Sequence, residues 1–210
     1  MTTLPSPKAL RPNAPAPLTP FAQFPDLSHY EPDVQFHEVA AGGAPLVITK
    51  ATQGTGYVDP TYKDFAARIR SVGMILGAYV FLDVGAEAPQ IAHFLSVAHL
   101  QAGDLQPVVD AEAQGLGKAE TFAALRDLEG RGYRPVLYAS LSFFHDALGS
   151  PCDWWLWLAA YRDKLPLLPN GVKLFAWQHT DHATFPGVAH PCDASYLYVP
   201  VPTLAATFCI

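Results

Sequence analysis

The stretch Pro107-Val108-Val109-Asp110-Ala111-Glu112 joins a short apolar run to two carboxylates, and the fold can be read outward from it. Its apolar half is typical of a short buried strand. The i, i+2 spacing points Asp110 and Glu112 to the same face of that strand. Reactive groups in parallel β/α barrels lie at the C-terminal ends of the strands. The stretch therefore predicts a barrel strand with two acidic groups at its mouth.

Similar apolar runs recur on both sides of this stretch. Strands are predicted at residues 24–28, 46–51, 74–81, 107–112, 135–140, 155–160, 173–178 and near 193–198. Amphipathic helices separate the early strands, as where Phe65, Ile69 and Val72 recur at i, i+4 and i+7. Glycines such as Gly73 and Gly103 are expected to close these helices. Alternating strands and helices argue for a parallel sheet, and eight strands argue for a closed barrel.

The spacing of the strands changes along the chain. Starts at residues 46, 74, 107 and 135 leave room for crossover helices, whereas starts at 135, 155, 173 and 193 are closer together. We therefore expect an α/β fold, a TIM-like barrel with an incomplete helical ring, (β/α)5(β)3. A doubly wound open sheet is the structural alternative, but no GxGxxG or GxxxxGK[ST] motif supports a nucleotide site. Residues 1–23, which hold six prolines, are expected to form an extended leader before a barrel domain over residues 24–210.

Composition excludes several classes of protein. The 210 residues are 50% hydrophobic and carry a net charge of −6 without a basic cluster, so a nucleic-acid binder is not expected. No apolar run approaches the roughly 18 residues of a membrane span. No apolar segment follows Lys8 and Arg11, so we expect synthesis in the cytoplasm without a signal peptide.

Metal and thiol chemistry are also not expected. His179 and His182 lack a third ligand, so neither a metal nor another cofactor is predicted. Cys152 and Cys192 each lie in a Pro-Cys-Asp tripeptide. A bridge between them stays open, with unpaired thiols as the simpler alternative.

Two more acids are predicted at the same mouth. Asp26 ends the first strand and Asp193 begins the last, and these strands are neighbours in a closed barrel. Two carboxylates forced together tend to split their pKa values, which leaves one as a general acid. The alternative is that Asp110 and Glu112 merely cap a turn. Aromatic side chains at strand ends suggest a glycan groove, with core packing as the alternative; they include Tyr79, Tyr138, Trp157 and Trp177, with Gln178 beside the last.

Several motifs occur in one order along residues 24–200. They are DLSHY at 26–30, ITKATQGT at 48–55, YVDP at 57–60, GAY at 77–79, PVVDAE at 107–112, LY at 137–138 and WQ at 177–178. Together they resemble glycoside hydrolase family 25, the Chalaropsis-type lysozymes. The resemblance implies N-acetylmuramidase activity, which is hydrolysis of the β-1,4 bond after N-acetylmuramic acid in peptidoglycan. It also implies a barrel of five β/α units plus three strands.

The resemblance assigns roles to individual residues. Glu112 is similar to the general acid, and Asp110 to the partner carboxylate that orients or stabilises the substrate N-acetyl group. Asp26 and Asp193 match the two outer aspartates. The residues expected to bind substrate are Tyr79, Tyr138, Trp157, Trp177, Gln178 and Gln53. The chain departs from the family pattern at three places: Gln53 stands where Glu is most familiar, Val80 where His is frequent, and Ser195 where Asn is usual.

Other functions stay open on the residues alone. Chitinase-like barrels also end a strand on D-x-E, although usually after a longer Asp-rich motif than this chain has. A glycan-binding protein without catalysis and a structural protein on a decayed barrel are further alternatives. We expect a monomer whose partner is the peptidoglycan glycan strand. Release by a holin, as for a phage endolysin, and injection by a secretion system are both compatible with the sequence.

Overall fold

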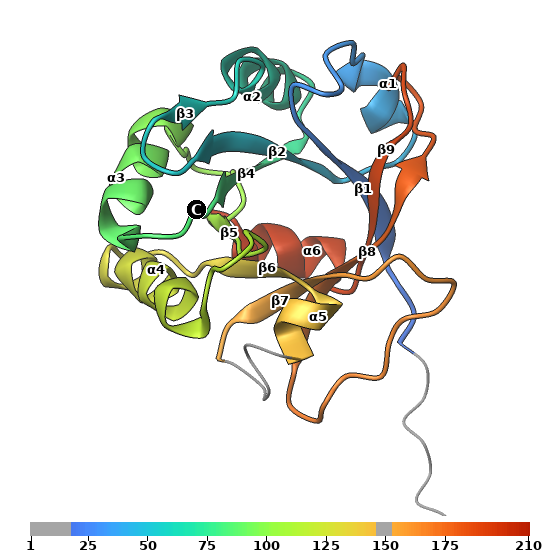
Figure 1. Ribbon diagram of the computed structural model, residues 1–210. Helices are drawn as coiled ribbons and strands as arrows, with labels where there is room; N and C mark the ends of the chain where they lie inside the picture. The colour runs from blue at the N-terminus through green and yellow to red at the C-terminus, as the bar shows by residue number, and fades with distance from the viewer. Residues whose placement is uncertain (1–17, 146–152) are drawn as a thin grey trace, which may run out of the picture.

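Eight strands close into a barrel in the part of the chain that the computed structural model describes, residues 18–145 and 153–210 (Figure 1). The strands are β1 (Ala22–Leu27), β2 (Leu46–Gln53), β4 (Ile75–Phe81), β5 (Val108–Asp110), β6 (Val136–Ser140), β7 (Trp155–Ala159), β8 (Lys173–Ala183) and β9 (Cys192–Leu197). Because β1 pairs with both β2 and β9, the sheet has no free edge in the barrel wall. The predicted closed barrel is confirmed.

The last strand runs against the others. β9 pairs antiparallel with both β1 and β8, whereas the pairings from β1 through β2 and β4 to β8 are parallel. The expectation of a wholly parallel sheet is therefore wrong at β9. The physical reason is the connection, because residues 184–191 are too few for a parallel crossover of a dozen or more residues. The reversal places the beginning of β9 beside the end of β1.

Helices cover only part of the barrel, as Figure 1 shows. The outer layer holds α1 (Phe36–Ala41), α2 (Tyr62–Ser71), α3 (Glu87–Ala98) and α4 (Lys118–Gly130). Between β6 and β7 the described residues include the single turn α5 (Leu141–Phe143), and residues 146–152 lie outside the described residues. Residues 160–172, between β7 and β8, form no helix, so the helical ring is incomplete as predicted.

One helix ends differently from the prediction. Gly73 follows α2 at a φ of 76°, as expected for a residue after a helix end. α3, however, ends at Ala98, and His99 takes the left-handed conformation at a φ of 43°. Gly103 is therefore not the cap of α3, because a residue with a side chain already turns the chain there.

Two apolar layers hold these elements together. One lies between the strands and the helices, and the other fills the barrel interior with residues such as Phe24, Trp157 and Phe175. The interior continues into a C-terminal segment, α6 (Val201–Thr203) and the π-helical turn η2 (Leu204–Phe208). The amide N of Gln106, just before β5, donates to Phe208 O at 2.6 Å. The segment therefore closes the end of the barrel opposite the mouth, and in Figure 1 its red ribbon crosses the centre of the barrel.

The first and second strands extend beyond their predicted limits. β1 begins at Ala22, while residues 1–17 of the Pro-rich segment lie outside the described residues. β2 continues to Gln53 after a register shift between Lys50 and Thr52, and there it pairs antiparallel with β3 (Tyr57–Val58). This hairpin stands at the mouth of the barrel.

Two further observations concern segments that sequence analysis singled out. Cys192 is buried, but Cys152 lies outside the described residues, and so does any pairing of the two. Across residues 18–145 and 153–210, no helix is both long enough and apolar enough to cross a membrane.

Candidate active site

A pocket of about 50 Å³ opens at the C-terminal ends of the parallel strands. Its lining residues are Asp26, Tyr79, Asp110, Glu112, Tyr138, Trp157, Gln178 and Asp193. All eight are among the ten site residues predicted from the sequence. The structure therefore brings together all four predicted acids and four of the six predicted substrate-binding residues.

Strand geometry explains why the four acids meet. Asp26 at the end of β1 is the register partner of Asp193 near the start of β9, so the antiparallel direction of β9 places both at the mouth. Asp110 ends β5, and Glu112 follows two residues later, beyond the strand. The acids thus approach the pocket from β5 on one side and from the β1–β9 pair on the other.

Burial makes the acid pair hard to ionise. Asp110 is 5% exposed, and burial raises its pKa well above the usual value, with the charge of Glu112 adding to the effect. Among the described residues, Asp110 Oδ1 has no hydrogen-bond partner. Burial also raises the pKa of Glu112, while the charge of Lys50 opposes the rise for both groups. A raised pKa keeps Glu112 protonated nearer neutral pH, as a general acid requires.

The outer acids are shifted in the same direction. Burial raises the pKa of Asp26 well above its usual value, and the charge of Asp193 adds to this. The pKa of Asp193 rises to about 7, mainly through burial and next through the charge of Glu31. Four carboxyl groups with raised pKa values therefore line one pocket, where the charge of each disfavours ionisation of its neighbours.

A polar chain crosses the floor of the pocket. Tyr138 Oη donates to Gln178 Oε1 at 2.8 Å, and Gln178 Nε2 lies 3.1 Å from each carboxylate oxygen of Asp26. Trp157 Nε1 donates to Ser195 Oγ at 2.8 Å. Ser195, which departs from the family pattern, thus orients Trp157. These bonds fix the side chains that surround the acids.

Two predicted substrate-binding residues do not line this pocket. Gln53 Oε1 accepts from Lys50 Nζ at 2.9 Å, and its Nε2 donates to Asp83 Oδ1 at 3.1 Å. Trp177 is 4% exposed and donates from Nε1 to Ala160 O at 2.8 Å. Both side chains are engaged with protein groups, and Trp177 instead borders a second hollow.

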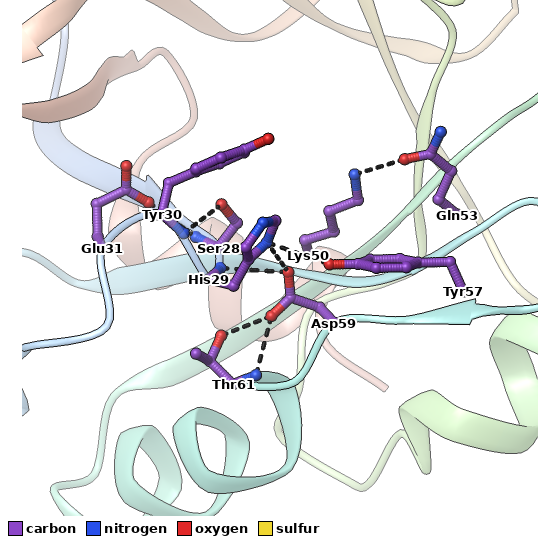
Figure 2. A network of polar contacts seen from close by, with 9 residues as sticks. All are labelled: Ser28, His29, Tyr30, Glu31, Lys50, Gln53, Tyr57, Asp59 and Thr61. Atoms are coloured by element: carbon purple, nitrogen blue, oxygen red, sulfur yellow. Dashed lines mark hydrogen bonds and ion pairs between the residues drawn. The ribbon is translucent and has the colours of Figure 1, made fainter.

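A network of polar contacts around Asp59 lies beside the pocket (Figure 2). Sequence analysis gave Asp59 no role. The side chain of Asp59 is fully buried, lies 2.9 Å from His29 Nδ1 and accepts from Thr61 Oγ1 at 2.6 Å. Tyr57 Oη lies 3.2 Å from the same nitrogen of His29. Lys50 Nζ lies 5.5 Å from the centre of the Tyr57 ring. The network joins the segments that follow β1 and β3 to Lys50 of β2, whose charge acts on Asp110 and Glu112.

The sequence contains the residues of this network in recognisable motifs, but it does not show that they meet. Ser28, His29, Lys50 and Asp59 all occur in motifs quoted above, yet no local spacing relates His29 to Asp59. Tyr161 was missed as well, although its Oη lies 3.3 Å from Gln178 Oε1. Across the described ranges, no group of three or more His, Cys, Asp or Glu side chains is arranged to hold a metal ion.

Comparison with known proteins identifies the family of the chain. Residues 25–188 match the model of the Glycosyl hydrolases family 25. The chain belongs to glycosyl hydrolase family 25. The family match spans the strands that carry Asp26, Asp110 and Gln178, so the pocket lies almost wholly within the matched residues.

Relatives in family 25 are similar over much of the chain. The autolytic lysozyme of Clostridium acetobutylicum is 26% identical over 176 residues, which cover 80% of this chain and 53% of that protein. The N,O-diacetylmuramidase of Chalaropsis sp is 29% identical over 145 residues, covering 60% of this chain and 69% of that protein. The protein YegX of Escherichia coli strain K12 is 28% identical, with 66% of its length covered. The chain thus spans about half to two thirds of the length of these curated relatives.

Solved structures share the fold. The family 25 glycosyl hydrolase from Bacillus anthracis superposes with a TM-score of 0.79 at 20% identity, covering 88% of this chain and 92% of that one. The lysozyme from Streptomyces coelicolor gives a TM-score of 0.78 at 23% identity, covering 88% and 95%. The family 25 barrel is therefore present here nearly whole.

Proposed function

We propose that this protein is a muramidase that hydrolyses the β-1,4 bond between N-acetylmuramic acid and N-acetylglucosamine in peptidoglycan. The observation that carries the proposal is the convergence of Glu112 and Asp110, both with raised pKa values, in one pocket with Asp26 and Asp193. Relatives named lysozyme and N,O-diacetylmuramidase support the choice of substrate.

In this proposal Glu112 is the general acid. It protonates the glycosidic oxygen as the bond to the anomeric carbon breaks, and the bonding electrons stay with the departing oxygen. Water then adds to the anomeric carbon and returns a proton to the Glu112 carboxylate. The raised pKa of Glu112 suits this role, because the group must be protonated when substrate binds.

Asp110 takes the complementary role beside the reacting sugar. Its Oδ1, which has no partner among the described residues, is available to accept a hydrogen bond from the acetamido N–H of the substrate. Such a bond favours the charged form of a carboxyl group and so offsets part of the cost of burial. Asp26 supports the arrangement through its bonds from Gln178, and Asp193 acts on Asp26 through its charge.

The substitution Glu112→Gln tests the assignment. The amide keeps the shape of the side chain but cannot deliver a proton, so kcat on purified peptidoglycan should fall roughly 10²–10⁴-fold with binding retained. Asp110→Asn should also lose most activity, because an amide cannot offset positive charge that develops at the sugar. Turnover by Glu112→Gln at the rate of the unaltered protein would refute the role of Glu112.

Product analysis separates the alternative functions. Borohydride reduction and mass spectrometry should find N-acetylmuramic acid at the new reducing ends. Reducing-end N-acetylglucosamine, or cleavage of chitin in preference to peptidoglycan, would indicate a chitinase-like specificity. Binding to peptidoglycan without any release of reducing ends would indicate a glycan-binding protein.

The setting is proposed on the same basis. The proposed site of action is the cell wall, where peptidoglycan lies, and a monomeric state stays a prediction. Release by a holin and injection by a secretion system stay predictions of the route to that wall.

A further inference from the structure

The outer acids Asp26 and Asp193 occupy the last rung of the β1–β9 ladder, at the mouth of the barrel. On the other side of β9, register shifts before and after Thr180 make the pairing with β8 irregular. The end of a ladder opens more easily than its middle, because a terminal pair has neighbours on one side only. The position of Asp193 therefore depends on what holds the chain beyond this rung.

A backbone contact between residues 33–35 and 187–189 holds the chain there. Beyond the last rung the two chains separate, and they meet again on the side of α1, which lies beside β9 in Figure 1. The backbone contacts are an antiparallel bridge of Val34 with Val188, a bond from Gln35 N to Gly187 O at 2.6 Å and a bond from Ala189 N to Asp33 O at 3.3 Å. We call the whole contact between residues 33–42 and 184–191 the clasp.

The two segments of the clasp approach each other closely at two glycines. A Cβ on Gly187, whose φ is 77°, would overlap Gln35 O and lie 2.8 Å from Glu38 Cβ. A Cβ on Gly42 would lie 2.9 Å from Pro186 Cγ, although the φ of −71° at Gly42 suits any residue. The contact therefore depends on the absence of a side chain at both positions.

The α1 side of the clasp is anchored to α2. The rings of Phe36 and Phe65 lie 5.1 Å apart in an edge-on arrangement. The guanidinium of Arg68 lies 5.2 Å from the centre of the Phe36 ring and donates to Val34 O. Val34 and Phe36 are both buried in the outer apolar layer. Because α2 holds this segment, the loop before β9 takes its position from the segment.

The clasp also sets the surroundings of Asp193. Between Asp26 and the clasp the chain turns at residues 28–31, where Ser28 N donates to Glu31 Oε2 at 3.0 Å (Figure 2). Burial raises the pKa of Asp193 to about 7, and the charge of Glu31 is the next cause. The other charged groups that act on this pKa are Asp181, Glu112 and His182. If Asp193 moved out into water, its pKa would approach the ordinary value of 3.8.

We infer that the clasp is a positioning device for the outer acids, which holds the first residues of β9 in register so that Asp193 stays opposite Asp26. Gly42 and Gly187 are then positioning residues, since the lining of the acid pocket includes neither. This inference rests on the proposed muramidase function, in which Asp193 is one of the four acids. It extends the working parts of the site to a contact outside the pocket.

Gly42→Ala tests the inference, because it adds a methyl group against Pro186 without straining the backbone. It should lower kcat on purified peptidoglycan roughly tenfold, within the hundredfold that a misplacement of about 1 Å can cost. Carbon-13 NMR of the Asp193 carboxyl carbon should show its titration midpoint moving from about 7 toward 3.8. A loss of stability alone would not move that midpoint in the folded protein.

Removal of the opposing atom should restore both properties. Pro186→Ala lacks the Cγ that the new methyl group meets, so in the double variant Gly42→Ala/Pro186→Ala both kcat and the Asp193 midpoint should recover. Gly130→Ala is the control, because it adds a methyl group at the end of α4, where no described residue outside that helix lies within 4 Å. It should change neither property.

Gly187→Ala gives a second and stronger displacement of the clasp. Its control is Gly73→Ala, because Gly73 has a φ of 76° and no described atom within 4 Å of an added Cβ. Both variants carry the same backbone strain, but only Gly187→Ala also pushes against the α1 side of the clasp. Only Gly187→Ala should therefore lower kcat and move the Asp193 midpoint, at a temperature where melting curves show both variants folded.

Two results would overturn the inference. One is a lower melting temperature in Gly42→Ala with kcat and the Asp193 midpoint unchanged, and the other is a double variant that recovers neither property. If the unaltered protein hydrolyses no peptidoglycan, the proposed function fails, and the Asp193 midpoint still decides whether the clasp positions this acid. If hydrolysis occurs and no clasp variant changes kcat or the midpoint, the clasp inference fails alone.

Discussion

Lys50 is the residue that most directly adjusts the acid pair. Its Nζ lies 4.9 Å from the centre of the Phe81 ring and donates to Gln53, and its charge lowers the pKa of both Asp110 and Glu112 against the larger effect of burial. A neutral side chain at position 50 would no longer lower the pKa values of Asp110 and Glu112.

Lys50→Met should therefore raise the pKa of Glu112. Because the acid must be protonated, the fall of activity on the alkaline side should move to higher pH, as measured in a pH profile of kcat. Gln53→Glu should move it in the same direction, since a carboxylate beside Lys50 offsets its charge. A shift to lower pH in Lys50→Met would contradict this account.

The raised pKa of Asp193 implies that this carboxyl group lowers the free energy of unfolding near neutral pH. A carboxyl group whose pKa is raised on folding binds more protons in the folded than in the unfolded state, so stability declines as pH rises through that interval. For Asp193 the interval runs from the ordinary 3.8 to about 7.

Asp193→Asn should consequently raise the melting temperature at pH 7.5 by a few degrees, because 1 kcal/mol corresponds to roughly 2–4 °C at this size. The gain should shrink as the pH falls and vanish below the ordinary value of 3.8, where the aspartate is protonated in both states. Asp181→Asn is the control, because the bond from His182 lowers the pKa of that carboxyl and its removal brings no gain. A gain independent of pH would point to packing instead of charge.

Among the elements, η2 is short, but we expect it to contribute strongly to stability. The ring of Phe208 lies 4.9 Å from that of Trp155 and 5.4 Å from that of Phe175 inside the barrel. Phe208→Ala should lower the free energy of unfolding by about 3–5 kcal/mol, as for other buried aromatic residues. Denaturant titration measures the change. The exposed Phe21→Ala should change it by less than about 0.5 kcal/mol, and a loss that small in Phe208→Ala would refute the role of η2.

The elements that were predictable are those with a local pattern. The buried strands show an apolar run, and helices α2, α3 and α4 show an amphipathic pattern. The positions of the acids follow once the strand ends are known. The direction of β9 was not predictable from its own residues, because the length of the preceding connection decides it. η2 has no periodic pattern, and its burial depends on a distant barrel end.

The side-chain partners at the mouth were harder to predict. His29 meets Asp59, and Tyr161 meets Gln178, only after the barrel has closed. Sequence spacing identifies strand ends, but it does not measure the distance between side chains on different strands. The acids could therefore be predicted, whereas the bonds that hold their neighbours could not.

For the molecule as a whole, net charge predicts how salt concentration affects activity on the proposed substrate. The chain carries a net charge of −6, and four acids lie in the pocket at its mouth. Peptidoglycan also bears carboxylates, so at low salt the two repel each other over about 30 Å. Raising ionic strength from about 0.01 to about 0.15 M shortens that range to about 8 Å. We expect kcat/KM on intact peptidoglycan to rise over this interval, and a fall would contradict the expectation.

The pairing of β1 with β9 also determines when the four-acid pocket can first form during synthesis. On the ribosome, Asp26, Asp110 and Glu112 emerge long before Asp193, and β1 has no second neighbour until β9 follows. Such distant pairings form late because the intervening chain must first be ordered. A nascent chain that ends after α4 thus carries three of the four acids but no closed mouth. We therefore expect the four-acid pocket to be completed in one late step of synthesis, after β9 has emerged.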